Sequence, residues 1–198
     1  MVTNTMLVLQ RENSRLQIEN QALAEEADRL REFVNLLDTL SSVEQPIASD
    51  EALMPLLRTV FFRSLDLLNA PDGSLMLLDE DANELEFVLV KGMLAERLSE
   101  YRIPADEGIA GWVIHNAQPA LVRDVRHDTR FSGTIDETFR FRTQSIAAVP
   151  LIGNGKTFGV LEALNQPSDN PFSDLDVQLL SLVCHFAGEL LMNIETNP

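Results

Sequence analysis

Cysteine, histidine and tryptophan are scarce in this chain. Its 198 residues include one cysteine, three histidines and one tryptophan. The lone Cys184 excludes an internal disulfide and predicts a small core residue. The histidines are not spaced as a ligand set, so we expect no metal and no cofactor; a single axial histidine on haem is the alternative to solvated or capping side chains. They are His115, His127 and His185.

Basic residues are also few. Lysine and arginine number 15 against 31 aspartates and glutamates, which gives a net charge of −16 and a pI of about 4.4. Such a surface makes nucleic acid and anionic membrane poor partners. Residues 1–10 do not resemble a signal peptide, and no uninterrupted apolar run approaches membrane-spanning length. We therefore expect a cytoplasmic protein.

Catalytic motifs are missing from the sequence as well. It contains no Ser–His–acid arrangement, no glycine-rich phosphate loop and no cluster of carboxylates. Gly108 and Gly111 are two glycines only, and they favour a turn into a short helix over a nucleotide fingerprint. We expect a protein that is not an enzyme.

Leucines at strict seven-residue intervals open the chain. An alternate seam of the same helix holds Ala27, Val34 and two asparagines, Asn13 and Asn20. This repeat predicts a parallel two-stranded coiled coil in which the asparagines pair and fix the register. A single amphipathic helix on its own domain would show a broader, less regular stripe. The leucines are Leu9, Leu16, Leu23, Leu30 and Leu37.

The remaining pattern alternates helices with hairpins. We expect a coiled-coil helix over 1–41, a linker over 42–48 and a folded domain over 49–198. Within that domain, paired apolar runs joined by short polar turns predict two β-hairpins, and a wide apolar stripe predicts a long final helix. The architecture is α+β around an antiparallel sheet. Its expected elements are helices at 50–68, 93–101, 108–116 and from 173 onward, and strands at 74–79, 85–90, 102–104, 119–122, 145–152 and 158–164.

Several segments of this domain resemble the GAF domain family over about residues 51–195. The resemblance implies a sensory or regulatory module with a six-stranded antiparallel sheet, terminal helices on one face and ligand-facing short helices on the other. It also implies dimerisation through the terminal helices. The segments that carry it are GIAGWVI at 108–114, QP at 118–119, VRD at 122–124, DTRF at 128–131, FRTQSIAAVPL at 141–151 and FGVLEALN at 158–165.

Members of that family that bind cyclic nucleotides carry a further motif, Asn-Lys, then Phe, then Asp-Glu. This chain keeps Asn165, Phe172 and Asp176, but Gln166 replaces the lysine and Val177 replaces the glutamate. The Lys–Asp pair that would hold the strand end to the helix start is therefore lost. The departure weakens a cyclic-nucleotide assignment without weakening the fold.

The resemblance places the ligand pocket at the polar segment 123–142, which holds five of the fifteen basic residues. Arginines on such a loop can fork onto a phosphate or carboxylate, or they can pair locally with Asp124, Asp128, Asp136 and Glu137. An aromatic ring there can stack on a base, and hydroxyls can hydrogen-bond the ligand. The candidate ligand residues are Trp112, Arg123, Phe131, Arg142, Thr143 and Ser145.

Two functions fit these features. One is a homodimeric sensor that binds a small ligand, with a small anion such as a cyclic nucleotide as the first candidate, and relays its state through the coil to a downstream signalling protein. The other is a ligand-free scaffold that serves as a dimerisation and docking module. Since the sequence ends three residues after Glu195, we expect output through a partner protein.

Overall fold

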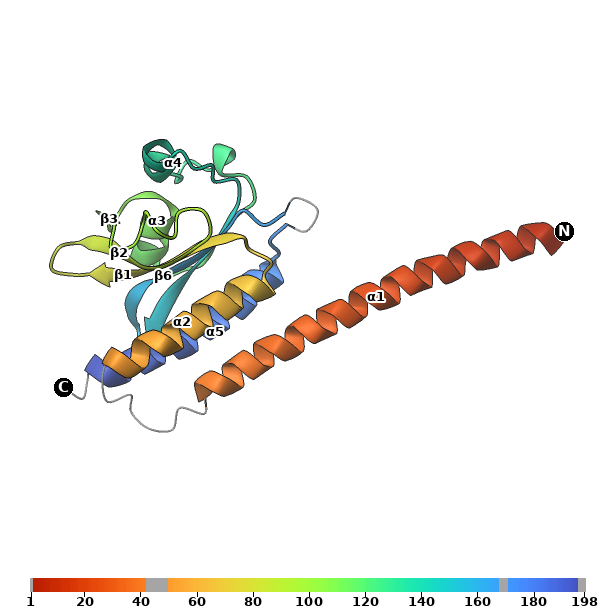
Figure 1. The fold of residues 1–198 in the computed structure, drawn as a ribbon, viewed down its shortest axis with the longest axis horizontal. Helices are drawn as coiled ribbons and strands as arrows, with labels where there is room; N and C mark the ends of the chain where they lie inside the picture. The colour runs from red at the N-terminus through yellow and green to blue at the C-terminus, as the bar shows by residue number, and fades with distance from the viewer. Residues whose placement is uncertain (1, 42–49, 168–170, 196–198) are drawn as a thin grey trace. The chain divides into compact units, whose positions relative to one another are not determined.

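A computed structural model describes residues 2–41, 50–167 and 171–195 (Figure 1). The expected linker at 42–48 lies outside the described residues. Contacts divide the chain into two compact units, Met1–Asn35 and Leu36–Pro198. The described elements are α1 (Val2–Ser41), α2 (Asp50–Leu67), β1 (Asp72–Asp79), β2 (Glu84–Lys91), β3 (Arg102–Pro104), α3 (Gly108–Asn116), β4 (Ala120–Val122), the 3₁₀ turn η1 (Val125–His127), α4 (Thr134–Phe139), β5 (Ile146–Gly153), β6 (Lys156–Leu164) and α5 (Asp174–Glu195).

The first unit is most of the long helix α1. Three of its heptad leucines, Leu9, Leu16 and Leu23, are 62%, 43% and 58% exposed. Ion pairs within the helix, such as Arg15 with Glu12 at 2.6 Å, lie at three-residue spacing. The exposed leucine edge is the surface that a coiled coil would bury.

The last turns of α1 belong to the second unit. Leu36 and Leu40 are buried there, whereas the heptad leucine Leu37 is half-buried. Leu36 lies one position before the leucine repeat and Leu40 three positions after Leu37. At its C-terminal end, α1 therefore buries the side that carries Leu36 and Leu40. The seven-residue leucine pattern did not predict this.

The second unit is built on a six-stranded sheet in the order β3-β2-β1-β6-β5-β4, with antiparallel pairing throughout. Two hairpins supply the four long strands. The tighter one, β5–β6, turns at Asn154 and Gly155, which have φ of 47° and 80°. Positive φ at both central turn residues matches the right-handed twist of the flanking strands. This α+β fold, with its six antiparallel strands and long N-terminal helix, confirms the expected fold class.

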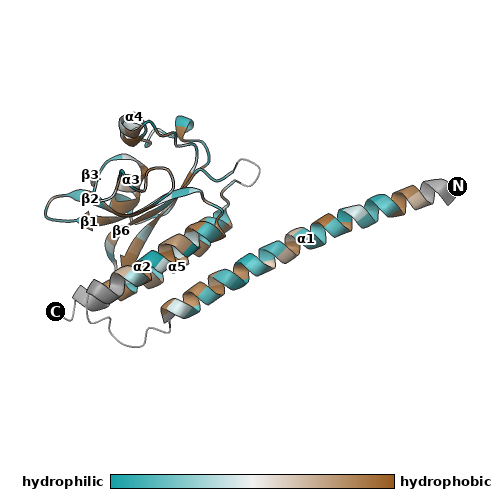
Figure 2. Ribbon diagram, viewed as in Figure 1, coloured by the Kyte–Doolittle hydropathy of each residue, from teal (hydrophilic) through white to brown (hydrophobic). Residues whose placement is uncertain are grey.

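Helices cover both faces of the sheet (Figure 1). On one face, α5 packs against β5 and lies beside α2. Gly153 and Gly188 let β5 and α5 approach closely, because a Cβ on Gly153 would stand 2.2 Å from the Gly188 carbonyl oxygen. On the other face, α3 contacts β5 and β6. The strands between them are largely apolar (Figure 2).

The segment 93–101, expected to be helical, forms consecutive turns instead. Leu94 and Leu98 are buried four residues apart, as in a helix. The chain then leaves that path, because the Glu100 amide donates to the Phe87 carbonyl of β2 and Glu100 adopts a φ of 62°. Pairing with the sheet edge overrides the local helical pattern.

One described helix, α5, is long and apolar enough to cross a membrane over residues 174–192. This window is not an uninterrupted apolar run, because Asp176, His185 and Glu189 lie within it. Half of that window is buried inside the domain, where α5 packs on the sheet, and core helices of soluble proteins pass the same test.

Candidate functional site

A hollow lies over the sheet face that carries α3 and α4. Its empty volume is about 740 Å³, space open to solvent included. Strands β1, β2 and β6 form the floor, the turns after β2 form one wall, and the start of α3 and the segment 131–143 form the other. Most of the lining is apolar, including Met76, Phe87, Ile109, Phe131, Ile135 and Phe141. A largely apolar cavity with a few polar groups is the usual form of a small-molecule site.

Two of the six candidate ligand residues, Phe131 and Thr143, line this hollow. Ser145 is buried just before β5, and its carbonyl accepts from the Asn165 amide at 3.0 Å. Trp112 lies under the Arg130 guanidinium, whose carbon is 4.4 Å from the ring centroid. Neither Ser145 nor Trp112 is among the lining residues.

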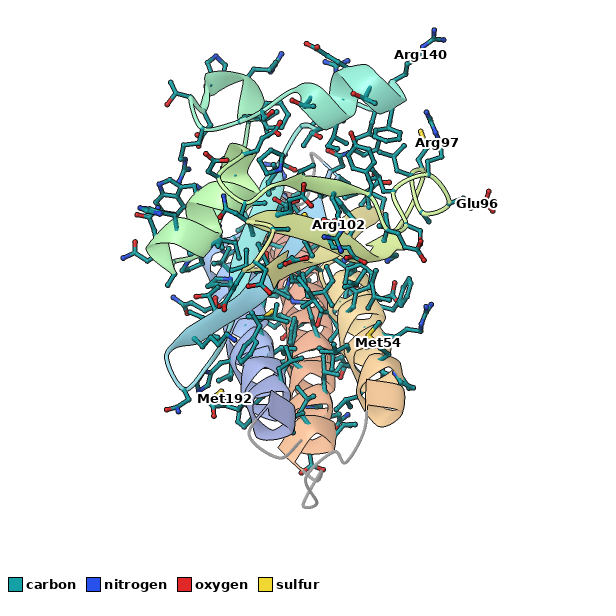
Figure 3. All side chains as sticks on the ribbon, turned by 90° about the vertical axis from the view of Figure 1, so that its left-hand side faces the viewer. Met54, Glu96, Arg97, Arg102, Arg140 and Met192 are labelled. Carbon is teal, nitrogen blue, oxygen red and sulfur yellow. The ribbon has the colours of Figure 1, made fainter. Side chains whose placement is uncertain are left out.

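The remaining two candidates, Arg123 and Arg142, are exposed and also lie outside the lining. Arg123 reaches Asp174 at the start of α5, at 3.5 Å. Arg142 takes part through its backbone, where its carbonyl accepts from the Asn165 side chain at 3.1 Å. Arg140, at the end of α4, points outward (Figure 3). The structure therefore does not gather these arginines around the hollow.

The other two arginines of the segment pair locally. Arg126 donates to Asp124 through two nitrogens, at 2.9 and 2.6 Å, and Arg130 does the same to Asp128 at the same distances. The hydrogen bonds from these guanidinium groups lower the pKa of both carboxyl groups. Local pairing, one of the two alternatives read from the sequence, is confirmed for Arg126 and Arg130.

Three carboxylates in the lining are tied to the protein itself. Asp72 accepts from the Met93 amide at 3.1 Å and from the Asn165 side chain at 3.3 Å. Asp136 accepts from the Thr143 amide at 2.8 Å and from the Thr143 hydroxyl at 2.7 Å. Glu107 accepts from the Ser132 hydroxyl at 2.5 Å. These bonds fix the loops that wall the hollow.

Lys91 supplies the lining's only cation among the described residues, and it is engaged elsewhere. Its ammonium donates to Asp66 at 2.6 Å and to the Ala70 carbonyl at 3.0 Å. Both acceptors lie at the end of α2 and just beyond it. The charge of Lys91 is therefore held at the rim by α2.

A further residue of the hollow, Glu162 on the central strand β6, was not predicted from the sequence. This side chain lines the hollow, and the Ser74 hydroxyl of β1 donates to its Oε2 at 3.3 Å. Burial raises the pKa of Glu162 from its ordinary value of 4.5 to about 7, against a smaller opposing effect of the Ser74 hydrogen bond. The signal in the sequence was a single carboxylate inside the otherwise apolar strand FGVLEAL at 158–164.

The degenerate nucleotide motif still joins strand to helix, with other partners. The Asn165 side chain accepts from the Gln144 amide at 2.7 Å. Gln166 is buried and donates to the Leu68 carbonyl at 2.6 Å, so it connects to the end of α2. Asp176 accepts from both the amide and the hydroxyl of Ser173, which caps the start of α5. Where the family motif has a charged lysine, this chain has the uncharged Gln166, which hydrogen-bonds the backbone near the end of α2.

The scarce residues take ordinary positions. Cys184 is 1% exposed within α5, and burial raises the pKa of its thiol, so the expected core role is confirmed. The three histidines are exposed, and His127 lies 3.1 Å from Asp124. The described residues contain no group of three or more histidine, cysteine, aspartate or glutamate side chains arranged to hold a metal.

Comparison with known proteins identifies the family. The family model of the GAF domain matches residues 53–191. Among curated proteins, the chain is 29% identical over 184 residues to the bovine cone cGMP-specific 3',5'-cyclic phosphodiesterase subunit alpha', a match covering 89% of this chain and 21% of that protein. It is 29% identical over 143 residues to the Drosophila melanogaster dual 3',5'-cyclic-AMP and -GMP phosphodiesterase 11, covering 65% of this chain and 10% of that protein. The chain thus spans about a fifth or less of the length of these two relatives.

Solved structures agree on the fold. The GAF domain of a phosphoenolpyruvate-protein phosphotransferase from Coxiella burnetii superposes with a TM-score of 0.69 at 17% identity, over 85% of this chain and 95% of that one. A free methionine-R-sulfoxide reductase from Neisseria meningitidis gives a TM-score of 0.65 at 16% identity, over 84% and 89%. Because the family model covers more than half of the residues, this chain belongs to the GAF domain family.

Proposed function

We propose that this protein is a non-enzymatic sensor that binds a small cytoplasmic ligand in the hollow over its sheet. The observation that carries the proposal is the hollow itself, which is largely apolar and lies between the sheet and the α3–α4 segments. GAF domains are small-ligand sensory and regulatory modules, and Phe131 and Thr143 lie in the lining where the resemblance places ligand contacts.

Two carboxylates of the hollow and the only thiol of the chain are placed in ways that favour ligand binding over catalysis. The carboxylates Asp72 and Asp136 are occupied by hydrogen bonds within the domain. The lone thiol, Cys184, is buried in α5, the helix that packs on the opposite face of the sheet from α3. A thiol held neutral by burial and remote from the hollow is a poor nucleophile.

We propose further that α1 forms a parallel homodimeric coiled coil and relays the ligand state to a partner signalling protein. The exposed leucines Leu9, Leu16 and Leu23 leave an apolar edge that a second copy would cover. Each buried leucine layer stabilises such a coil by about 1–2 kcal/mol. Leu30 and Leu37 would extend the same seam, and Asn13 and Asn20 would fix its register.

Cyclic nucleotides are the first named ligands to test, because the curated relatives are cyclic-nucleotide phosphodiesterases. Arg142 and Phe131 make a useful pair of variants, since Phe131 lines the hollow and Arg142 lies outside it. Calorimetry with cyclic AMP and cyclic GMP should therefore show any binding weakened by Phe131→Ala and little changed by Arg142→Ala.

A native mass spectrum of the purified full chain tests the proposal as a whole. We expect a dimer at twice 22.1 kDa that carries a small molecule released on denaturation. The alternative is a ligand-free scaffold, favoured by the altered nucleotide motif at Gln166 and Val177. A dimer with no retained molecule, together with no heat from any ligand offered, would support the scaffold and contradict the sensor.

A further inference from the structure

Glu162 is a carboxylate on the floor of an apolar hollow. Its neighbours along the same face of β6 are Val160 and Leu164, two residues away on either side. Its neighbours on the adjoining strands are Ser74 of β1 and Ala148 of β5. Ser74 is thus the single hydrogen-bonding side chain among these four neighbours, and its donor lies 3.3 Å away.

No cation of the described protein neutralises this carboxylate. None of the ion pairs among the described residues involves Glu162. Lys91 is held by Asp66, and the arginines of the 123–142 segment lie outside the lining. Transfer of an ionised carboxylate into apolar surroundings costs free energy unless the charge is paired or hydrogen-bonded.

The other charges of the lining make the hollow electronegative. Asp72, Glu107, Asp136 and Glu162 face it, against the single ammonium of Lys91. The three aspartate and glutamate side chains other than Glu162 each accept at least one hydrogen bond from the walls. An anion placed among these groups meets like charge and no free cation.

We propose that this hollow takes a small, largely apolar or aromatic molecule bearing an ammonium or another cationic N–H group, and that Glu162 accepts a hydrogen bond from that group. The inference rests on the proposed ligand-binding function of the hollow and assigns it a chemical class. The apolar walls, among them Phe87, Phe131 and Phe141, would receive the body of the molecule. An ammonium against Glu162 would supply the missing counter-charge, and Ser74 would orient the carboxylate. The raised pKa of Glu162 is what an unpaired carboxylate in this position shows.

Three probes that share a phenyl ring and differ in one group test this class by calorimetry on the full chain at pH 8. They are 2-phenylethylamine, 2-phenylethanol and phenylacetate. We expect the amine to bind about tenfold more tightly than the alcohol, because the ammonium adds the attraction of opposite charges to a hydrogen bond that both probes can donate to ionised Glu162. The acid should bind most weakly, and cyclic GMP and cyclic AMP should bind more weakly than the amine.

Substitution locates the effect. Glu162→Gln keeps the shape and removes the charge, so amine affinity should fall about tenfold, towards that of the alcohol. Glu137→Gln removes an equal charge from α4 at an exposed position outside the lining, and it should leave amine affinity within about twofold. The fluorescence of the single Trp112 and the far-UV spectrum establish that both variants are folded.

The pH profile gives a second readout. Amine affinity should fall as the pH drops below 7 and level off about tenfold lower, near the affinity of Glu162→Gln, because protonated Glu162 has no charge to offer. The other titratable groups that face the hollow are Asp72, Lys91, Glu107 and Asp136, and all remain in Glu162→Gln. The profile of that variant should therefore be nearly flat between pH 6 and 8 if Glu162 is responsible.

Tighter binding of phenylacetate or a cyclic nucleotide than of the amine would overturn the assigned class and leave the sensor standing. So would amine binding that is equal in Glu162→Gln and the unaltered protein. Failure of every probe, together with a native mass spectrum free of retained molecules, would instead overturn the sensor and the inference together.

Discussion

The substitution Glu162→Gln should stabilise the ligand-free domain at pH 8 and should stabilise it much less at pH 5. The carboxyl of Glu162 has its pKa raised from 4.5 to about 7 by burial. Glutamine has nearly the same shape as a protonated glutamate and can still accept from Ser74. Only the ionised form of Glu162 therefore differs much from the variant.

Proton linkage gives the sign and the size of this change in unfolding free energy. The folded state holds the proton more tightly than the unfolded chain, so the stability due to Glu162 is complete below pH 4.5 and is lost as the pH rises through 7. At about 1.4 kcal/mol per pH unit, this difference corresponds to roughly 3 kcal/mol. Glu162→Gln should recover up to that amount at pH 8.

Urea unfolding followed by Trp112 fluorescence measures this directly, since Trp112 is the one tryptophan and lies in α3. Asp79, Asp124 and Asp128 have lowered pKa values, so their contributions are present above about pH 4 and are lost below it. Their window does not overlap that of Glu162. Glu137→Gln, which removes a charge from the exposed side of α4, serves as the control and should follow the unaltered protein.

Equal unfolding free energies of the unaltered protein and Glu162→Gln at pH 8 would refute the reasoning. A loss of stability in the variant at both pH values would also refute it. That second result would mean that Glu162 accepts more or stronger hydrogen bonds than the single one from Ser74.

Three further predictions concern assembly and packing. Deletion of residues 1–35, which keeps the buried Leu36 and Leu40, should shift the protein from dimer to monomer in sedimentation equilibrium at micromolar concentration; a persistent dimer, or a monomeric full chain, would contradict the coiled coil. Replacing Asn13 and Asn20 with leucine should raise the melting temperature and mix the oligomeric states, whereas an unchanged melting point and a clean dimer would place both side chains on the solvent side. Gly188→Ala should cost more than about 2 kcal/mol in urea unfolding, because its Cβ would stand 2.4 Å from the Ile152 carbonyl group; Gly133→Ala, where the nearest atom is 3.8 Å away, is the control and should change little.

The sequence was a good guide to the sheet, because its hairpins leave local signals. The short turn between the two apolar runs at 145–152 and 158–164 predicted β5 and β6 within a few residues. The helix at 108–116 was likewise predicted at its observed position. By contrast, 93–101 shows helical spacing but is held in turns by hydrogen bonds to β2, a long-range effect that local pattern does not record.

The candidate site was harder to predict, since it depends on where side chains point. The five arginines of 123–142 suggested an anion site, but Arg126 and Arg130 fold back onto aspartates two residues away. Glu162 was not predicted because a single carboxylate within an apolar strand is common in sequences and does not by itself indicate a site. Its importance depends on facing the hollow at the centre of the sheet, which requires the strand order and the register with Ser74.

Hydrogen exchange of the full chain, read by mass spectrometry with and without saturating 2-phenylethylamine at pH 8, tests the central claim that the hollow is the ligand site. We expect slower exchange in peptides that cover the start of α3, the 131–143 segment and the middle of β6, all of which border the hollow. Saturable binding with protection confined to α2, α5 or the β5–β6 turn, and none around the hollow, would contradict it.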